Sequence, residues 1–432
     1  MKIAFVSTEK LPVPALSGGA VQIYIEGVLP YLSKYYEITV FSGTGSGFAP
    51  GEKSGTVRHF RLPAEEKSGS VRFIRIPAAK PGQYIDAVRS RLDSSFDLVH
   101  IFNRPLWLLS LYESHPKLAY SLSLHNDMFH PDKMTGSEAF ECASKARFVT
   151  AVSKYIADRT IAYCPAVRDK MHVIYSGVDA GRYLPASGTN KDAPVPAFTN
   201  RSPDQAVAGQ SPVSANTSQS PDPAEVPYAP VPVAGMAGDV KKRKTILFVG
   251  RLTPEKGVHV LLRAMKRIME EREGITLVIA GSKRFGSNES DGYVRSLQAL
   301  SGELGGRVIF TGFLQPDELI EYYRNADIFV CPSQWNEPLA RVLYEAMASG
   351  LPIVASDKGG NAEVVSAYEN GILVKEYKSH DAVAEAISIL LDDPLKAGEM
   401  GRAGRELVIA KHGWDRVADN IRRIIDVHAK KI

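Results

Sequence analysis

The sequence predicts an α/β fold made of two doubly wound, Rossmann-like domains. Three observations support this prediction. Apolar and helix-forming segments alternate along the first 175 residues, the alternation resumes at Thr245, and a proline-rich stretch separates the two halves. Alternating strands and helices produce parallel sheets with helices on both faces. A chain of 432 residues is also long enough for two domains.

The first half, residues 1–184, is predicted to form an N-terminal domain. Its strands are short apolar runs, and most of them are followed by a helix-forming segment. We expect strands at Lys2–Ser7, Ile38–Ser42, Leu98–Phe102, Ala119–Leu124, Phe148–Val152 and His172–Tyr175. We expect helices at Ala20–Lys34, Gln83–Leu92, Leu106–Glu113, Ser137–Lys145 and Lys154–Tyr163.

A near-repeat lies within this half, because residues 52–64 are almost duplicated at 66–78. Each copy alternates like a strand and ends at proline, so we expect two adjacent strands. We interpret the pair as a duplicated edge strand, and a basic lip beside a binding site is the functional alternative.

Residues 185–241 form a predicted linker insertion rich in Pro, Ala and Ser. The stretch holds 10 of the 27 prolines and few large apolar residues, so it cannot repay the entropy of ordering. We expect a disordered tether between a first domain and a second domain at residues 242–413.

The second half begins with an apolar strand that is followed by two positively charged side chains. The run Lys244–Gly250 is followed by Arg251 and Lys256, and an apolar helix begins near Val258. Ligands of open α/β sheets bind at the carboxyl ends of the strands. A guanidinium and an ammonium at this edge suit a diphosphate.

Two carboxylates lie eight positions apart at a later junction between a strand and a helix. Glu337 and Glu345 do not share a helix face, since eight helical residues rise about 12 Å. Between them, free amides of Leu339, Ala340 and Arg341 at a helix start favour a phosphate. The pattern indicates a polyol–phosphate–polyol ligand, a nucleotide sugar. The alternative interpretation makes both glutamates solvated surface residues.

These motifs together resemble the GT-B, family 4 type glycosyltransferases. The matching segments are Val249–Gly257, Glu337–Val354 and Gly359–Gly360, with residues 14–20 and His125 in the first half. The likeness covers the chain except for residues near 185–241. Residues 1–24, 102–105, 124–129 and 333–341 resemble, more narrowly, spore-coat-associated glycosyltransferases.

The resemblance implies a fold in which two domains face each other across a cleft. A last helix, residues 414–432, would cross back to the N-terminal, acceptor-side domain, with Trp414 as a packing anchor. Trp414 would then be no sugar platform. Sugar would move from a nucleoside-diphosphate sugar to an acceptor hydroxyl, with retention at the anomeric carbon.

The resemblance also implies roles for particular residues. Arg251 and Lys256 would neutralise the diphosphate, Glu337 would hold sugar hydroxyls and Glu345 the ribose. The catalytic set is then His125, Arg251, Lys256 and Glu337, and the donor-binding set is Gly18, Gly19, Leu339, Ala340, Arg341 and Glu345. His125 would contact the donor sugar rather than remove a proton.

Two residues have open alternatives. Glu363, after Gly359 and Gly360, is interpreted either as a cap of its own helix or as a ligand contact. Asp127 is the candidate base of an inverting reaction, which the residues alone leave open. The segment 338–341 is Pro-Leu-Ala-Arg where the family often has Gly-Phe-Gly, which leaves the donor's identity open.

Composition narrows the possible partners and location. A formal charge of +4 and the lack of an aromatic-basic module do not indicate nucleic-acid binding. Three cysteines without CxxC spacing suit a reducing compartment. The expected location is therefore the cytoplasm or, by the narrower resemblance, the spore coat.

We expect no signal peptide, no integral membrane segment and no metal or other cofactor. The first apolar run is too short for a signal peptide, and no run is long enough to span a bilayer. Since the sequence contains no Asp-x-Asp, we expect Arg251 and Lys256 to replace a cation at the diphosphate. The acceptor is a glycan, a protein or a small molecule.

Two other functions remain open at this stage. One is a nucleotide-sugar epimerase on a similar fold, which would act without an acceptor. The other is a structural coat protein that keeps the fold without turnover. The presence of Arg251, Lys256, Glu337 and Glu345 argues against a decayed site but not against a binding-only role.

Overall fold

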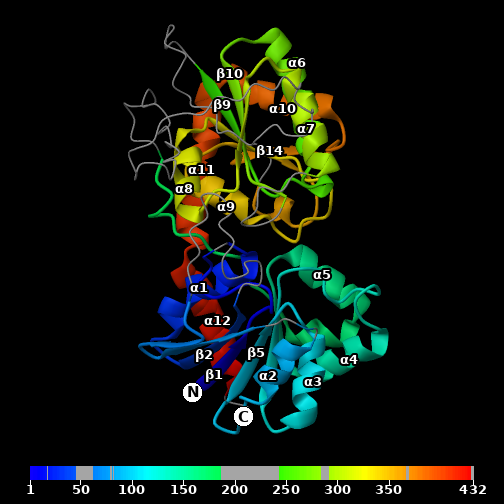
Figure 1. Ribbon diagram of the computed structural model, residues 1–432, viewed down its shortest axis with the longest axis vertical. Helices are drawn as coiled ribbons and strands as arrows, with labels where there is room; N and C mark the ends of the chain where they lie inside the picture. Colours follow the sequence, from blue (N-terminus) through cyan, green and yellow to red (C-terminus); the bar gives the residue numbers. More distant parts are fainter. Residues whose placement is uncertain are drawn as a thin grey trace, which may run out of the picture.

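Figure 1 shows a computed structural model of the protein, which describes residues 1–16, 18–44, 62–77, 80, 82–185, 243–283, 291–365 and 369–429. The described residues form two lobes, each with its own sheet. The N lobe contains β1–β8 and the last helix, α12. The C lobe contains β9–β14. The expected tether, except Pro185, and most of the first copy of the near-repeat lie outside the described residues.

The N-lobe sheet has eight strands in the order β3-β4-β2-β1-β5-β6-β7-β8. All neighbours are parallel except β3 and β4, which are antiparallel. Its elements are β1 (Lys2–Val6), α1 (Ala20–Leu32), β2 (Glu37–Gly43), β3 (Glu65–Ser68), β4 (Val71–Ile76), α2 (Gln83–Arg89), β5 (Leu98–Phe102), α3 (Leu106–Ser114), β6 (Ala119–Leu124), α4 (Gly136–Lys145), β7 (Ala146–Ala151), α5 (Lys154–Tyr163) and β8 (Met171–Val173).

The C-lobe sheet has six parallel strands in the order β11-β10-β9-β12-β13-β14. Its elements are β9 (Lys244–Val249), α6 (Val258–Glu271), β10 (Ile275–Ala280), α7 (Gly292–Gly302), β11 (Val308–Gly312), α8 (Pro316–Asn325), β12 (Ile328–Cys331), α9 (Arg341–Ala348), β13 (Ile353–Ser356), β14 (Gly371–Val374), α10 (His380–Asp392) and α11 (Pro394–Lys411). Helix α9 ends at Ala348, and Gly350, two residues later, has a φ of 71°, which favours glycine.

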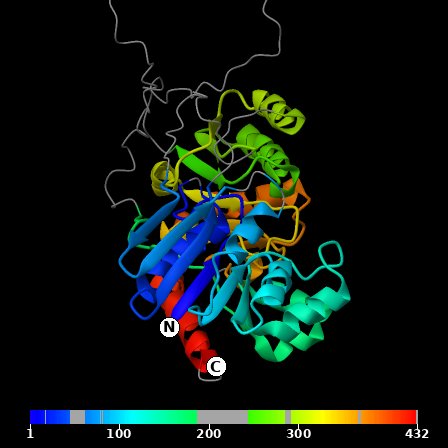
Figure 2. The ribbon, with the colours of Figure 1, turned by 60° about the horizontal axis from the view of Figure 1, so that its bottom comes forward.

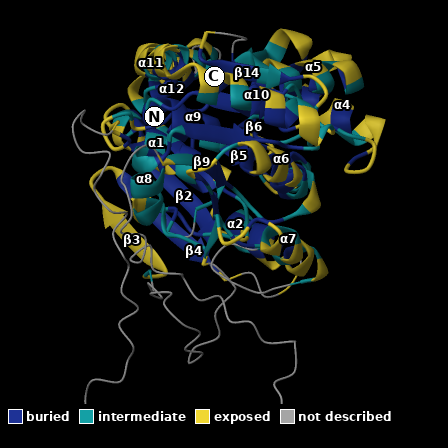
Figure 3. Ribbon diagram, turned by 90° about the horizontal axis from the view of Figure 1, so that it is seen from above, coloured by how far each residue is buried: buried dark blue, intermediate teal, exposed yellow. Residues whose placement is uncertain are grey.

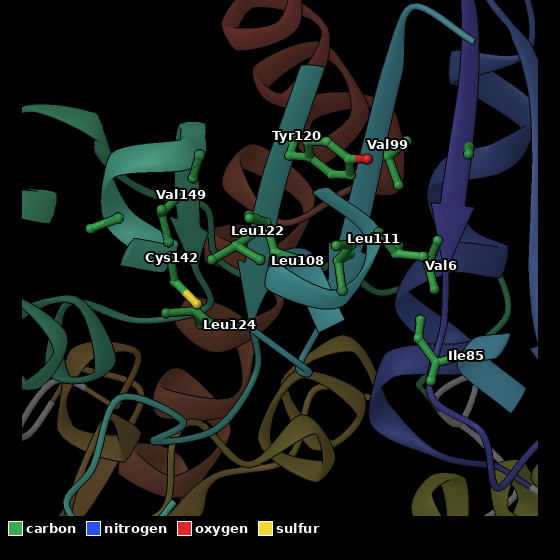
Figure 4. Close-up of a cluster of buried hydrophobic side chains, with 14 of the residues drawn as sticks. Val6, Ile85, Val99, Leu108, Leu111, Tyr120, Leu122, Leu124, Cys142 and Val149 are labelled. Carbon is green, nitrogen blue, oxygen red and sulfur yellow. The ribbon is translucent and has the colours of Figure 1, made fainter. Parts of the chain in front are cut away.

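The strands lie buried between helices, which is why they read as continuous apolar runs. Figure 3 shows the central strands in the buried colour and the outer helices with exposed faces. One N-lobe core cluster joins Val6, Val99 and Leu122 of the sheet to Leu108 and Leu111 of α3 (Figure 4). Apolar side chains are therefore buried in one cluster with α3 and in another with α1, and parallel strands bring their carboxyl ends to one edge of the sheet.

The second copy of the near-repeat contains a β-hairpin. Strands β3 and β4 pair through residues 65–68 and 71–74, with Gly69 at a φ of 60° in the turn. The sheet is extended at its β2 side by β4, and β3 forms the edge. The expectation of a single strand from each copy is therefore wrong for this copy, which contributes to both β3 and β4, and only β3 lies at the edge of the sheet.

The last helix, α12 (Trp414–Ala429), returns to the N lobe as expected (Figure 2). Its apolar face, Val417, Ala418, Ile421 and Ile425, joins a core cluster with side chains of α1. Trp414 fills the space beside Gly27 and Gly177, where an added Cβ would lie 2.3 and 2.5 Å from the indole. Trp414 is thus a packing anchor of α12 on the N lobe.

Candidate functional site

The C-lobe sheet has a topological switch point between β9 and β12. The chain runs outward from β9 to β10 and β11 on one side and to β12, β13 and β14 on the other. Lys256 follows β9 and Glu337 follows β12, so both lie just beyond the carboxyl ends of these paired strands. Open α/β sheets bind ligands at this point.

Lys256 and Glu337 form a direct ion pair. The Lys256 ammonium is hydrogen-bonded to Glu337 Oε1, which also accepts from Ser333 Oγ at 2.8 Å. Only 5% of the Glu337 side chain is exposed, and 19% of that of Lys256. A buried charge with its partners in place is held in one position. This excludes the interpretation of Glu337 as a solvated surface residue.

Two glycines let the backbone around this pair pack closely. Gly257 has a φ of 75°, and a Cβ there would lie 1.9 Å from the carbonyl oxygen of Pro332. Gly359 has a φ of 60°, and a Cβ there would lie 2.0 Å from the carbonyl oxygen of Glu337. Both positions therefore need glycine for conformation and for space.

Trp335 lies beside the ion pair. The Lys256 ammonium is 5.6 Å from the centroid of its ring, and the indole remains 38% exposed. A cation near a ring face is attracted to it electrostatically. The exposed ring thus borders the charged part of the site.

Glu345 is also buried, which excludes its interpretation as a solvated residue. Its Oε2 accepts from the Tyr323 hydroxyl at 2.9 Å, and its Oε1 lies 3.5 Å from Nη2 of Arg341. Burial and Glu345 raise the pKa of Tyr323 well above its usual value. The phenol therefore stays a hydrogen-bond donor to this carboxylate.

Arg341 connects the two lobes. Its Nη1 donates to Ser176 Oγ at 3.0 Å and to the Gly177 carbonyl at 3.3 Å, and its guanidinium lies 5.6 Å from the Trp414 ring centroid. Its side chain thus contacts both the N lobe and Trp414, the first residue of α12. In this conformation, Arg341 bridges the lobes.

The prediction of free amides at Leu339, Ala340 and Arg341 is wrong in its details. Helix α9 begins at Arg341, so Leu339 precedes it. The Ala340 amide donates to Asn361 Oδ1 at 3.1 Å, so it is not free. Arg341 is instead the first helical residue, where an amide has no intrahelical acceptor.

Arg251 and Lys256 both follow β9 and precede α6. The Arg251 side chain is 41% exposed, and its Nη2 is 3.6 Å from Glu255 Oε1. An exposed pair of this kind is weak and breaks easily when a stronger anion arrives. Arg251 thus follows β9, as expected, with its guanidinium accessible to solvent.

On the N lobe, His125 follows β6 and is buried. Its backbone amide donates to Asn103 Oδ1 at 3.1 Å, its Nε2 lies 3.2 Å from Ser123 Oγ, and the Tyr24 ring packs edge-on at 4.7 Å. Burial, with help from His100 and Arg341, lowers the pKa of His125 to about 3. The imidazole is therefore neutral near pH 7.

Asn103 is a residue that the sequence analysis missed. It has a φ of 58°, which is uncommon outside glycine, and its side chain accepts from the amides of both His125 and Asn126. A strained residue held by its surroundings marks a functional loop in many proteins. Its position could have identified it in the sequence, because it comes directly after the predicted strand at 98–102, at the edge where ligands bind.

Gly18 and Gly19 have φ angles of 84° and 101°, and Gly19 caps the start of α1. A Cβ on Gly19 would lie 2.5 Å from Gln22 Oε1 and 2.8 Å from Leu11 Cδ1. The backbone thus turns tightly here, and a side chain has no room on this side of Gly19.

Glu363 caps a helix, but not its own. It ends the short 3-10 turn Asn361–Glu363 of the C lobe, and its carboxylate accepts from the backbone amides of Lys154 and Tyr155 at 2.7 Å each. The Tyr175 hydroxyl also donates to it at 2.9 Å. All three donors belong to the N lobe, so the self-capping interpretation is wrong.

Asp127 follows His125 but is already engaged. Its Oδ2 bonds the Arg159 guanidinium, and its backbone carbonyl accepts from Lys133. Its Oδ1 is buried and has no hydrogen-bond partner within the described part of the chain. No acceptor hydroxyl can reach that oxygen while it stays buried.

The described residues contain neither a candidate membrane-spanning helix nor a candidate cluster of metal-binding side chains. None of their helices is both long and apolar enough to cross a membrane. They also contain no group of three or more His, Cys, Asp or Glu side chains placed to hold a metal ion.

Comparisons with known proteins agree with this arrangement. Residues 237–407 match the family Glycosyl transferases group 1, and residues 18–182 match Glycosyltransferase Family 4. Spore coat protein SA of Bacillus subtilis (strain 168) is 36% identical over 422 residues, 98% of each chain. The putative glycosyltransferase YtcC of the same strain is 34% identical over 425 residues, covering 98% of this chain and 91% of YtcC.

Solved structures share the fold at low identity. Sucrose-phosphate synthase from Thermosynechococcus elongatus has a TM-score of 0.71 at 21% identity and covers 100% of both chains. Anabaena HepE in complex with UDP-glucose has a TM-score of 0.67 at 18% identity, covering 99% of this chain and 100% of HepE. Likeness at this level shows two Rossmann-like domains in the GT-B arrangement.

Proposed function

Because this chain belongs to the group 1 and family 4 glycosyltransferases, we propose that it moves a sugar from a nucleoside-diphosphate sugar to an acceptor hydroxyl. We further propose that the reaction needs no metal ion and retains the configuration of the anomeric carbon. The observation that carries the proposal is the buried Lys256–Glu337 pair at the switch point of the C-lobe sheet.

The charges of the pair suit the two parts of such a donor. An ammonium attracts the diphosphate, and a carboxylate accepts hydrogen bonds from sugar hydroxyls. When the donor binds, the diphosphate competes with Glu337 for Lys256 and frees a carboxylate oxygen for the sugar. The UDP-glucose complex of HepE, which has this fold, supports the donor class.

Cations of the chain supply the charge that a metal ion would otherwise provide. Negative charge grows on the diphosphate as the bond to the sugar breaks, and groups fixed in advance stabilise it best. Lys256 is held by Glu337 and Trp335, and Arg251, which also follows β9, has only a weak partner. This supports a metal-independent reaction.

The states of Asp127, the candidate base, and of His125 support retention. An inverting reaction needs a base on the face opposite the leaving group, to take the proton of the acceptor hydroxyl. His125 is buried with a lowered pKa, and Asp127 is paired with Arg159 while its second oxygen is buried. In a retaining reaction the departing phosphate oxygen lies on the attacking side and can take that proton.

A thermal-shift screen with UDP-, GDP-, ADP- and dTDP-sugars, in buffer with EDTA, tests the donor class. We expect one nucleotide to raise the melting temperature without added metal. NMR of the product made with a panel of acceptors then assigns the anomer. An inverted product contradicts retention, and an isomerised donor formed without acceptor indicates an epimerase instead.

Association with the spore coat belongs to this proposal as well. It rests on the name of the relative Spore coat protein SA and on the length of the match, which spans 98% of both chains. Fractionation of spores from the source organism with an antibody to this chain tests it, and absence from the coat fraction contradicts it.

A further inference from the structure

Helix α5 of the N lobe starts at the boundary between the lobes (Figure 1). Its first residues are Lys154 and Tyr155, and Ser153 is its N-cap residue, accepting from the Ile156 amide through Oγ at 3.2 Å. The first amides of a helix have no partner within the helix and must bond elsewhere. Here the amides of Lys154 and Tyr155 are bonded by Glu363 of the C lobe, 209 and 208 residues away.

A carboxylate is the best partner for such a helix start. The amides point toward it, and the helix dipole adds a favourable field for negative charge. The Tyr175 hydroxyl, which follows β8, completes the set of three donors. Burial and the bond to Glu363 raise the pKa of Tyr175 to about 12, so it remains a donor near pH 7.

The segment that carries Glu363 also builds the donor site. The Gly360 amide donates to the Glu337 carbonyl at 2.8 Å, and Asn361 accepts from the Ala340 amide. Gly360 additionally lies against Ser153, because a Cβ there would be 3.0 Å from the Ser153 Cβ. Residues 359–363 therefore touch Glu337 on one side and the start of α5 on the other.

We propose that Glu363 is a positioning residue that fixes the donor site of the C lobe against the N lobe. Separating the lobes at this point breaks three hydrogen bonds to one carboxylate. The segment that supports Glu337 then loses these contacts with the N lobe. Glu363 touches no reacting atom in this arrangement, and it sets how often the two halves of the site are correctly assembled.

A direct readout of this role is amide hydrogen exchange at the start of α5, followed by mass spectrometry of a peptide spanning residues 150–163. We expect Glu363→Ala to speed exchange there by about tenfold, since hydrogen bonds to charged groups are the stronger ones. Glu363→Gln keeps one acceptor oxygen, so we expect a smaller increase. Glu399→Gln, at an exposed glutamate of α11, is the matched control and should change nothing.

The second experiment measures transfer kinetics and therefore rests on the proposed function, whereas the hydrogen-exchange experiment does not. We expect Glu363→Ala to lower kcat about tenfold while the KM for the donor changes little, because Lys256 and Glu337 remain in place. Tyr175→Phe removes one of the three bonds and should have a weaker effect on both readouts. Unchanged exchange at α5 in a folded Glu363→Ala protein overturns the proposal, whether or not transfer is measured.

Discussion

At the carboxyl ends of its strands the C lobe carries a buried ion pair, whereas the N lobe carries a buried neutral histidine and more exposed ion pairs. The C lobe holds the Lys256–Glu337 pair, with 19% and 5% of the side chains exposed. The N lobe has the neutral His125, and two of its ion pairs, Glu9–Arg104 (27% and 28% exposed) and Asp127–Arg159 (24% and 41% exposed), are more open to solvent.

One strand–helix plan thus supports two different environments. Desolvated charge interacts strongly with a charged ligand, so the C lobe suits the diphosphate end of a donor. Neutral groups around His125 can contact a hydroxyl-rich molecule without competing for that charge. The difference between the two environments therefore comes from the loops after the strands and not from the sheets.

The largest expected effect comes from breaking the charged pair of the C lobe. Lys256→Ala and Glu337→Ala should each lower kcat/KM for transfer by roughly 10²–10³-fold, the usual loss when a preorganised group is removed. Lys266→Ala breaks the exposed Lys266–Glu303 pair and is the matched control, with no expected change. Full activity in both site variants would refute the assigned site.

Two glycines with the same φ, one in each lobe, allow the stability cost of an added side chain to be compared. Gly359 in the C lobe and Gly69 in the N lobe both have a φ of 60°, but only Gly359 lies against a backbone oxygen. Gly69→Ala should cost about 1–2 kcal/mol in the free energy of unfolding, from the φ angle alone. Gly359→Ala should cost roughly 2–5 kcal/mol, because overpacking is added. Urea unfolding measures both, and equal losses would show that the contact with Glu337 is unimportant.

Acid should weaken the N lobe. Burial lowers the pKa of both His100 and His125 to about 3, against an ordinary value of 6.5. Between these values the unfolded chain binds protons that the folded chain does not, so stability falls as the pH is lowered. Each histidine should remove roughly 1 kcal/mol between pH 7 and 5.5.

Urea unfolding at the two pH values checks this expectation. His100→Gln should reduce the difference between them, whereas His380→Gln, at an exposed position of the C lobe, should leave it unchanged. An unfolding free energy that is independent of pH in this window would contradict the role of the buried histidines.

The smallest expected difference compares two buried tyrosines. The Tyr323 hydroxyl donates to the Glu345 carboxylate at 2.9 Å, and the Tyr84 hydroxyl donates to the Ser7 carbonyl at 3.0 Å. Tyr323→Phe should cost about 1.5–3 kcal/mol, because a charged acceptor loses its partner, and Tyr84→Phe about 0.5–1.5 kcal/mol. Thermal unfolding measures the two losses, and a larger loss in the N lobe would reverse the comparison.

Much of the fold could be predicted from the sequence, because local patterns determine it. The expected strand at 98–102 coincides with β5, and the expected helix at 154–163 coincides with α5. The motif around Glu337 and the cation Lys256 could also be found, since each follows an apolar run. Their direct pairing across 81 residues could not, because spacing does not show which side chains meet.

The contacts missed at the sequence level are all long-range. Asn361 occupies the amide of Ala340, Tyr323 bonds Glu345, and Glu363 reaches the start of α5. Each depends on how two elements pack, which no periodicity reveals. The positive φ of Asn103 likewise depends on the loop after β6 that it supports.

The return of α12 has a consequence for biosynthesis. The N lobe is translated first, yet Val417, Ile421 and Ile425 complete one of its core clusters. Until these residues leave the ribosome, the part of α1 that packs against α12 has no cover and is open to chaperones or to self-association. The N lobe can therefore complete the packing of this core cluster only after α12 has been synthesised.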